Sequence, residues 1–192
     1  MEADWFIDIG LELPWIDGSW SGFLDLRATP YAINTLPEPA QHPALRDALL
    51  ALNAPASNLY TSKCDAWSVP GHEIDPDEFS ARRQHAATGF ASYIDILDRD
   101  PARFSSFALT EHRVRELTEH LHHFTINCAR VDTVVRRAAA QASDSTEVDG
   151  YGITLYAAAC GADPTAAYIA WQTALAAAVA ATIAVAATRA GE

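Results

Sequence analysis

Basic residues are scarce in this chain. Lys63 is the only lysine, and lysine and arginine together number 13 against 25 aspartates and glutamates, which gives a formal net charge of −12. Such a surface repels nucleic-acid phosphates and anionic lipid and attracts basic molecules. We therefore expect no nucleic-acid binding, even though short Arg82-Arg83 and Arg136-Arg137 pairs occur. An acidic composition also promotes solubility alone, so the charge does not by itself demand a partner.

Cysteine is also rare. Cys64, Cys128 and Cys160 are odd in number and far apart, and no CxxC pair occurs. This pattern excludes a disulfide framework and a zinc knuckle, and it predicts buried free thiols. The first residues, Met-Glu-Ala-Asp-Trp, lack the basic start and apolar run of a signal peptide, so we expect a cytoplasmic protein.

Local catalytic motifs are missing as well. The sequence contains no GxSxG, GxxxxGK[ST], GxGxxG or HExxH pattern. Catalytic groups can also be assembled from distant positions, so this absence does not exclude an enzyme, but it removes each specific reason to propose one. We therefore favour a protein without catalytic activity and assign it no catalytic residue, cofactor or metal.

What the chain does have is a long stretch without charge, residues 164–188, in which alanine dominates. Asp163 suits the N-cap and Pro164 suits the first helical position, while Arg189 and Gly191 mark the end. Large apolar residues recur on one side at helical spacing, and the other sides are mostly alanine. The pattern predicts one long helix without a polar face.

Three interpretations of this helix compete. A core helix packed on a sheet is favoured, because alanine lets backbones approach closely. A contact between subunits through small residues would make the protein a homo-oligomer. A membrane span is the least favoured, since large aliphatic residues are few and Gln172, Thr173 and Thr182 interrupt the stretch.

The remaining periodicity predicts an α+β fold, a mainly antiparallel sheet of hairpin-connected strands with helices on one face. Apolar residues alternate with other residues in 5–12 and again in 20–27, on either side of Asp17-Gly18. This pattern predicts a hairpin, with Trp15 and Trp20 near its loop. We expect these tryptophans to cover the core, and we favour this over a surface on which a ligand stacks.

Further strands are predicted at 59–69, 90–98, 104–109 and 151–160, and at 126–135, where a helix is equally compatible. Helices are predicted near 43–53, 76–88, 110–124 and 164–189.

This order suggests a single domain over residues 1–192. It can be subdivided into residues 1–70, with the N-terminal hairpin, a helix and a strand, and residues 71–192, with two ββα-like units. The two units, 90–124 and 126–189, are similar in pattern and not in residue identity. An internal duplication is therefore only a suggestion.

One loop gathers chemically active side chains. Residues 71–79 hold His72 and four carboxylates, which suits a hard divalent cation or a histidine base oriented by a carboxylate. Local structure explains most of this cluster, because Asp75 is placed to cap the helix expected at 76–88, and the spacing fails the calcium-loop pattern. We favour that explanation and keep His72, Glu73 and Asp75 as candidate binding residues, together with Trp67.

The helix predicted at 110–124 carries further histidines. His112, Glu116, Glu119 and His123 form a column almost opposite the apolar stripe, so a solvated face is favoured over a zinc site. His120 lies beside the stripe and is the fifth candidate. A shared pocket would require His120 to converge with His72.

Three functional hypotheses follow. The leading one is a non-catalytic cytoplasmic protein, immunity-like or adaptor-like, whose acidic surface binds a basic protein partner. The alternative is a small enzyme or a small-molecule or metal-binding protein with a pocket built from His72, Trp67, His120 and nearby carboxylates. The third is an oligomeric structural subunit that assembles through residues 164–188.

Overall fold

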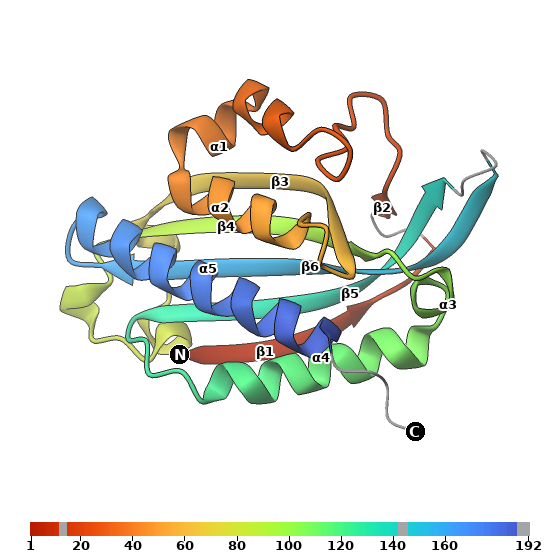
Figure 1. Cartoon of the computed structure of the whole chain (residues 1–192). Coiled ribbons are helices and arrows are strands. Elements are labelled where there is room, and N and C mark those ends of the chain that lie inside the picture. The colour runs from red at the N-terminus through yellow and green to blue at the C-terminus, as the bar shows by residue number, and fades with distance from the viewer. Residues whose placement is uncertain (12–14, 142–145, 188–192) are drawn as a thin grey trace.

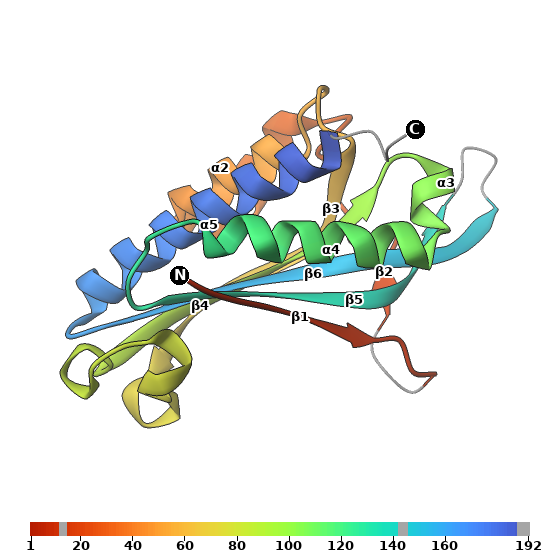
Figure 2. The same ribbon diagram turned by 90° about the horizontal axis from the view of Figure 1, so that it is seen from below.

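The computed structural model describes residues 1–11, 15–141 and 146–187. They form a six-stranded mixed sheet with the order β1-β5-β6-β4-β3, and the short β2 also pairs with β5 (Figure 1). The pairs among β3, β4, β5 and β6 are antiparallel, whereas β1 and β2 run parallel to β5. Helices α2, α4 and α5 lie on one face of this sheet (Figure 2). The predicted α+β class is confirmed.

The strands occur largely where alternation or apolar runs predicted them. The ambiguous segment around 126–135 is a strand from Ala129 onward, and the strands predicted at 59–69, 90–98 and 151–160 are longer by one, two and five residues. The strands are β1 (Glu2–Asp8), β2 (Ile16–Asp17), β3 (Leu59–Pro70), β4 (Thr88–Asp98), β5 (Ala129–Gln141) and β6 (Glu147–Gly161).

The α-helices are α1 (Pro37–Gln41), α2 (Pro43–Leu52), α3 (Pro101–Phe104), α4 (Phe107–His122) and α5 (Pro164–Ala187). Short 3-10 turns complete the described elements: η1 (Pro30–Thr35), η2 (Gly71–Glu73), η3 (Pro76–Phe79) and η4 (Arg83–His85).

Helix α5 crosses the sheet between α2 and α4 (Figure 1). Asp163 caps it as predicted, because its Oδ1 accepts a hydrogen bond of 2.9 Å from the backbone N–H of Ala166. Trp171 and Leu175 are fully buried, while Ile169 and the alanines on the outer side remain exposed. The predicted core helix is therefore present, and the end signals Arg189 and Gly191 lie outside the described residues.

By length and composition, α5 is the one helix in the described part of the chain that is able to cross a membrane. Half of its most apolar window is buried against the rest of the protein, and a core helix of a soluble protein meets the same criteria. This property is therefore weak support for a membrane span.

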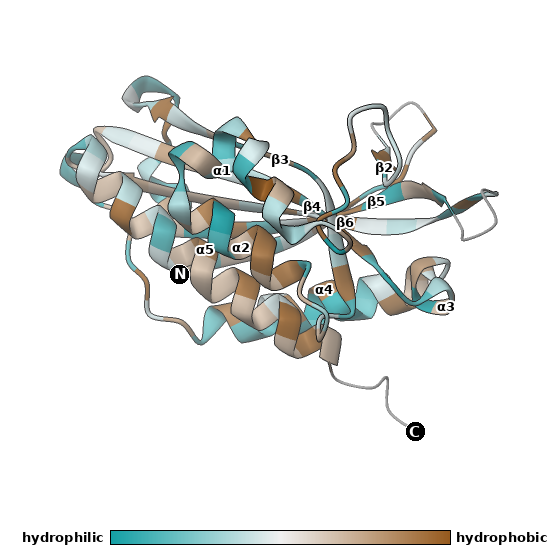
Figure 3. Cartoon of the chain, turned by 45° about the horizontal axis from the view of Figure 1, so that its top comes forward, coloured by the Kyte–Doolittle hydropathy of each residue, from teal (hydrophilic) through white to brown (hydrophobic). Residues whose placement is uncertain are grey.

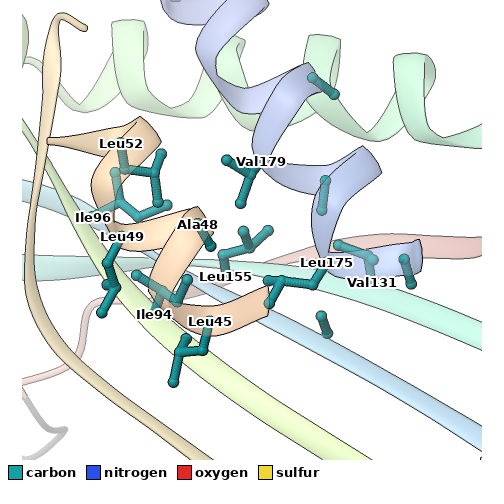
Figure 4. Close-up of a cluster of buried hydrophobic side chains, with 14 of the residues drawn as sticks. Leu45, Ala48, Leu49, Leu52, Ile94, Ile96, Val131, Leu155, Leu175 and Val179 are labelled. Carbon is teal, nitrogen blue, oxygen red and sulfur yellow. The ribbon is translucent and has the colours of Figure 1, made fainter. Parts of the chain in front are cut away.

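The main core lies between the helices and the sheet. Figure 4 shows leucines of α2 meeting Ile94 and Ile96 of β4, Leu155 of β6 and Leu175 of α5. Burying each of these side chains stabilises the fold by about 1.5–3 kcal/mol. In Figure 3, α5 is mostly brown and pale, which agrees with its role as the apolar centre of the helical layer.

The predicted N-terminal hairpin is wrong. Residues 20–27 form turns and irregular loop, and β1 instead pairs in parallel with β5, with Glu2 opposite Arg130 and Asp8 opposite Arg136. A partner more than a hundred residues away leaves no local signal, because alternation specifies a half-buried strand and not the strand beside it.

The predicted helix 76–88 is also wrong. Asp75 does cap a turn, since its Oδ1 accepts a hydrogen bond of 3.0 Å from the Asp77 N–H, but this turn is only η3. Ser80 then adopts a left-handed conformation with φ of 46°, and Thr88, the last residue of the predicted helix, begins β4. Since the segment has no apolar stripe to bury, its good cap does not extend into a helix.

The strand predicted at 104–109 does not form either. Phe104 ends α3, and α4 begins at Phe107. The Ser106 hydroxyl accepts a hydrogen bond of 3.3 Å from the Leu109 N–H and caps this helix. The first ββα unit is therefore absent, and only the second, built from β5, β6 and α5, is present.

Candidate functional site

The sheet face opposite α2, α4 and α5 is here called the open face, because none of the described α-helices covers it (Figure 2). Side chains alternate along β4, so Ile94 and Ile96 pack against the helices while Tyr93 and Asp95 point to the open face. The side chains that strand register places on this face therefore form the principal candidate surface.

Three aromatic side chains cross the open face and are here called the aromatic row: Trp67 of β3, Tyr93 of β4 and Tyr156 of β6. The ring centroids of Trp67 and Tyr93 are 6.3 Å apart, and those of Tyr93 and Tyr156 are 6.1 Å apart. Strand register also aligns Asp65 with Tyr93 on one side, and Tyr156 with Asp132 on the other. Carboxylates therefore flank the two tyrosine rings at both ends of this line across the sheet.

A polar network lies beside the aromatic row and is centred on Arg136 of β5. Its Nη1 donates to Asp8 Oδ2 at 2.8 Å, and its Nε donates to Thr154 Oγ1 at 3.1 Å. The Thr154 hydroxyl in turn donates to Asp95 Oδ1 at 2.6 Å, and Arg136 Nη2 reaches the Tyr156 hydroxyl at 3.4 Å. Four strands thus hold one guanidinium in a fixed orientation.

Burial sets the electrostatics of this network. It raises the pKa of the Asp95 carboxyl, and the hydrogen bond from Thr154 and the charges of Arg136 and Lys63 counteract only part of this effect. Burial also raises the pKa of the Tyr93 hydroxyl, with the neighbouring Asp95 and Asp65 acting in the same direction. The Tyr93 hydroxyl therefore remains a hydrogen-bond donor at neutral pH.

A cavity of about 220 Å³ opens at this network, and we call it the charged cavity. Lys63, Arg136 and Asp95 line it together with aromatic and polar groups from β4 and β6, and with Ile16 of β2 and the preceding Trp15. The complete lining is Trp15, Ile16, Lys63, Tyr93, Asp95, Arg136, Thr154 and Tyr156.

A second cavity of about 380 Å³, here called the apolar groove, adjoins the charged cavity at Lys63 and Tyr93. It lies between β3 and the segment 20–38, which supplies most of its apolar wall. Its apolar lining includes Trp20, Leu24, Leu26, Leu36 and Leu49.

The predicted loop site lies elsewhere. His72, Glu73 and Asp75 line a shallow depression with Arg83, and His72 Nε2 lies 3.7 Å from Glu73 Oε1. The side chains of His72 and Glu73 are 81% and 59% exposed, so this contact is strongly screened by water. Trp67 does not line that depression and belongs to the aromatic row.

His120 is separated from that loop by the sheet. It lies on α4, on the helix-covered face, whereas the yellow-green segment between β3 and β4 lies on the side of the open face (Figure 2). His120 is exposed, and its Nδ1 is 3.0 Å from the carbonyl oxygen of Glu116. The structure therefore does not bring His72 and His120 together.

His112 lies on a solvated face of α4, as predicted, whereas His122 Nε2 lies 2.9 Å from the carbonyl oxygen of Ala3. His112 Nε2 lies 3.3 Å from Glu116 Oε1, one helical turn away, and both side chains are accessible to water. In the part of the chain that is described, no three histidine, cysteine, aspartate or glutamate side chains gather as metal ligands.

Sequence reasoning missed the residues of the polar network. Asp95 lies two residues after Tyr93 in β4, so both side chains share one face of a strand that is almost entirely buried. Thr154 and Tyr156 have the same two-residue spacing in β6. A carboxylate in an otherwise apolar strand is a sequence signal that could have pointed to this network. Its partners could not be named, because they come from other strands.

No protein-family model matches this chain, and comparisons with curated proteins and with solved structures find no match either. An α+β fold alone carries no function. The functional argument therefore rests on the geometry of the open face.

Proposed function

We propose that this chain is a non-catalytic cytoplasmic protein, immunity-like or adaptor-like, that binds a basic protein partner through its open face. The observation that supports this proposal is the aromatic row with carboxylates beside it on an uncovered sheet. Arginine and lysine side chains favour both ring faces and carboxylates. A surface that combines the two is suited to basic side chains.

Asp65 and Trp67 form the strongest local feature of this surface. Both are exposed on edge strand β3, and the Trp67 ring extends toward Tyr93. A guanidinium stacked on these rings can reach the Asp65 carboxylate. At the opposite edge, Asp4 of β1 is also exposed and lies in register with Asp132.

The net charge of −12 extends this complementarity to the whole molecule. Long-range attraction of this kind raises the rate of association and selects against acidic competitors, and salt weakens it. An immunity-like or adaptor-like protein benefits from both effects, because it must find one partner quickly among many.

The test begins with capture from an extract of the native cells at about 0.05 M and about 0.5 M salt. The test variant combines Asp65→Asn with Trp67→Ala. The matched control combines Asp47→Asn on α2 with Tyr31→Ala on η1, since both of these side chains are also exposed. Any recovered protein is then purified and titrated against all three chains.

We expect a partner with a net positive charge. The test variant should weaken its binding by at least about tenfold, the control should not, and the higher salt should also weaken it. Equal binding by test and control variants, or affinity independent of salt, would contradict the proposal. If only the protein itself is recovered and light scattering shows an oligomer, assembly through residues 164–188 replaces it.

A further inference from the structure

Lys63 occupies an unusual position between two cavities. It lies at the irregularity in β3 where the register with β4 shifts between Thr61 and Cys64, and it lines both the charged cavity and the apolar groove. Its Nζ lies 5.5 Å from the centre of the Trp20 ring. Among the ion pairs of the described residues, none includes Lys63, so its charge remains available to a ligand.

Arg136 supplies a second cation to the charged cavity. Its side chain is only 14% exposed, and its bonds to Asp8 and Thr154 fix the guanidinium in place. Asp8 offsets part of its charge. A fixed fork of N–H donors is the geometry that recognises carboxylates.

The acidic group of the charged cavity is Asp95, which is 8% exposed and accepts the hydrogen bond from Thr154. Burial raises its pKa, so its negative charge is disfavoured. Arg137 adds a further positive charge nearby, since its guanidinium carbon lies 4.0 Å from the centre of the Trp15 ring. Within the lining of the charged cavity, two cationic side chains, Lys63 and Arg136, therefore face one carboxyl group, that of Asp95.

The apolar groove continues from Lys63 with a different chemistry. Leu24, Leu26 and Leu36 form much of its wall, and Trp20 also lines it. Glu38 also lines this groove, so an anionic group is favoured at the cavity end and not at the groove end. Together the two volumes fall within the range of about 300–1,000 Å³ that is usual for small-molecule sites.

We propose that the charged cavity and the apolar groove form one binding site for a small organic carboxylate with an apolar body. The carboxylate accepts hydrogen bonds from Arg136 and Lys63, and the body lies in the groove beside Trp20. The site shares Tyr93 and Tyr156 with the aromatic row, but its cations Lys63 and Arg136 take no part in the contact with the basic partner proposed above, which is tested at Asp65 and Trp67.

Three probes of the same shape test the charge preference: cinnamate, cinnamyl alcohol and cinnamylamine, each titrated into the full chain by calorimetry. We expect cinnamate to bind at least about tenfold more tightly than the alcohol and the amine to bind most weakly. Nuclear Overhauser effects from the cinnamate ring should reach the methyl groups of Leu24 and Leu36.

Two variants and a matched control locate the site. Lys63→Gln and Arg136→Gln should each weaken cinnamate binding by at least about fivefold. Arg130→Gln should leave it unchanged, because Arg130 lies on the same strand as Arg136 and pairs with Asp132 outside the cavity. Lys63 is half-buried and has no ion-pair partner among the described residues, so Lys63→Gln should leave the fold intact. This variant therefore still tests the site if the Arg136→Gln protein fails to fold.

The proposal is overturned if none of the three probes binds or if all bind equally. It is also overturned if Arg130→Gln weakens cinnamate binding as much as Lys63→Gln does. Loss of basic-partner binding in the Asp65 and Trp67 variant would leave the cinnamate result unaffected, so the two proposals fail separately.

Discussion

The indole N–H of Trp171 donates a hydrogen bond of 2.9 Å to the hydroxyl of Ser92, which joins the first half of α5 to the middle of β4. Both residues are buried, with exposed fractions of 0% and 1%. Phe90 packs beside the same indole, with ring centroids 4.6 Å apart. One polar contact inside an apolar layer therefore fixes the position of the long helix on the sheet.

Replacing Ser92 by alanine should lower the free energy of unfolding by about 1–3 kcal/mol, because the buried indole N–H loses its acceptor. Urea denaturation followed by circular dichroism measures this change. Ser68→Ala on β3 is the control, since Ser68 is exposed. Equal effects of the two substitutions would show that the hydrogen bond to Trp171 contributes nothing.

Arg113 of α4 and Asp98 at the end of β4 form an ion pair, with side-chain exposures of 9% and 3%. Arg113→Met should destabilise the fold by about 3–5 kcal/mol, because it leaves Asp98 charged and unpaired in the interior. Glu111→Gln breaks the exposed pair with Arg115 and should cost at most about 0.5 kcal/mol. Denaturant titration compares the two, and similar losses would contradict the difference in burial.

Asp95 predicts a dependence of stability on pH. Its folded-state pKa is raised above 3.8 by burial, so the folded chain binds this proton more tightly than the unfolded chain. Stability should therefore fall as the pH rises from 3.8 through the raised pKa, and the loss should persist at neutral pH. Asp95→Asn keeps an oxygen acceptor for Thr154 and removes the charge.

We expect this variant to gain stability relative to the natural chain, and the gain should be larger at neutral pH than near pH 3.8. Thermal denaturation across this range measures the difference, with Asp65→Asn on the exposed edge of β3 as the control. If the stability gained by Asp95→Asn became smaller as the pH rises, the raised pKa of Asp95 would be contradicted.

The cysteine thiols provide a chemical prediction. Burial raises the pKa of Cys64 to about 12 and that of Cys160 to about 11. Because the thiolate is the reactive form, iodoacetamide should label both far more slowly in the folded protein at pH 8 than in urea. Mass spectrometry of the labelled peptides follows each site. Equal rates for Cys64 in both conditions would rule out its burial.

The sequence by itself determined the elements whose signals are local. Asp163 and Pro164 predicted the start of α5, and uninterrupted helical spacing predicted that it continues through Ala187, the last described residue. Alternation and apolar runs likewise located β3, β4 and β6, because a half-buried or buried strand leaves its period in the chain. The α+β class followed from these elements.

Tertiary structure decided the elements whose local preferences were balanced or misleading. Phe104 to Leu109 has a strand-like composition, yet Phe104 and Leu109 belong to helices once Asp100 and Ser106 cap them. The loop after Asp75 has a good cap but no buried stripe, so it remains two short turns.

Of the candidate site residues, Trp67 was placed on the open face, while His72, Glu73, Asp75 and His120 lie apart from the charged cavity. The sequence placed Asp95 and Thr154 in their strands. Only antiparallel register brought them into contact and set Arg136 beside them. Strand period is a property of neighbouring residues, whereas strand pairing depends on which distant segments bury their apolar faces together.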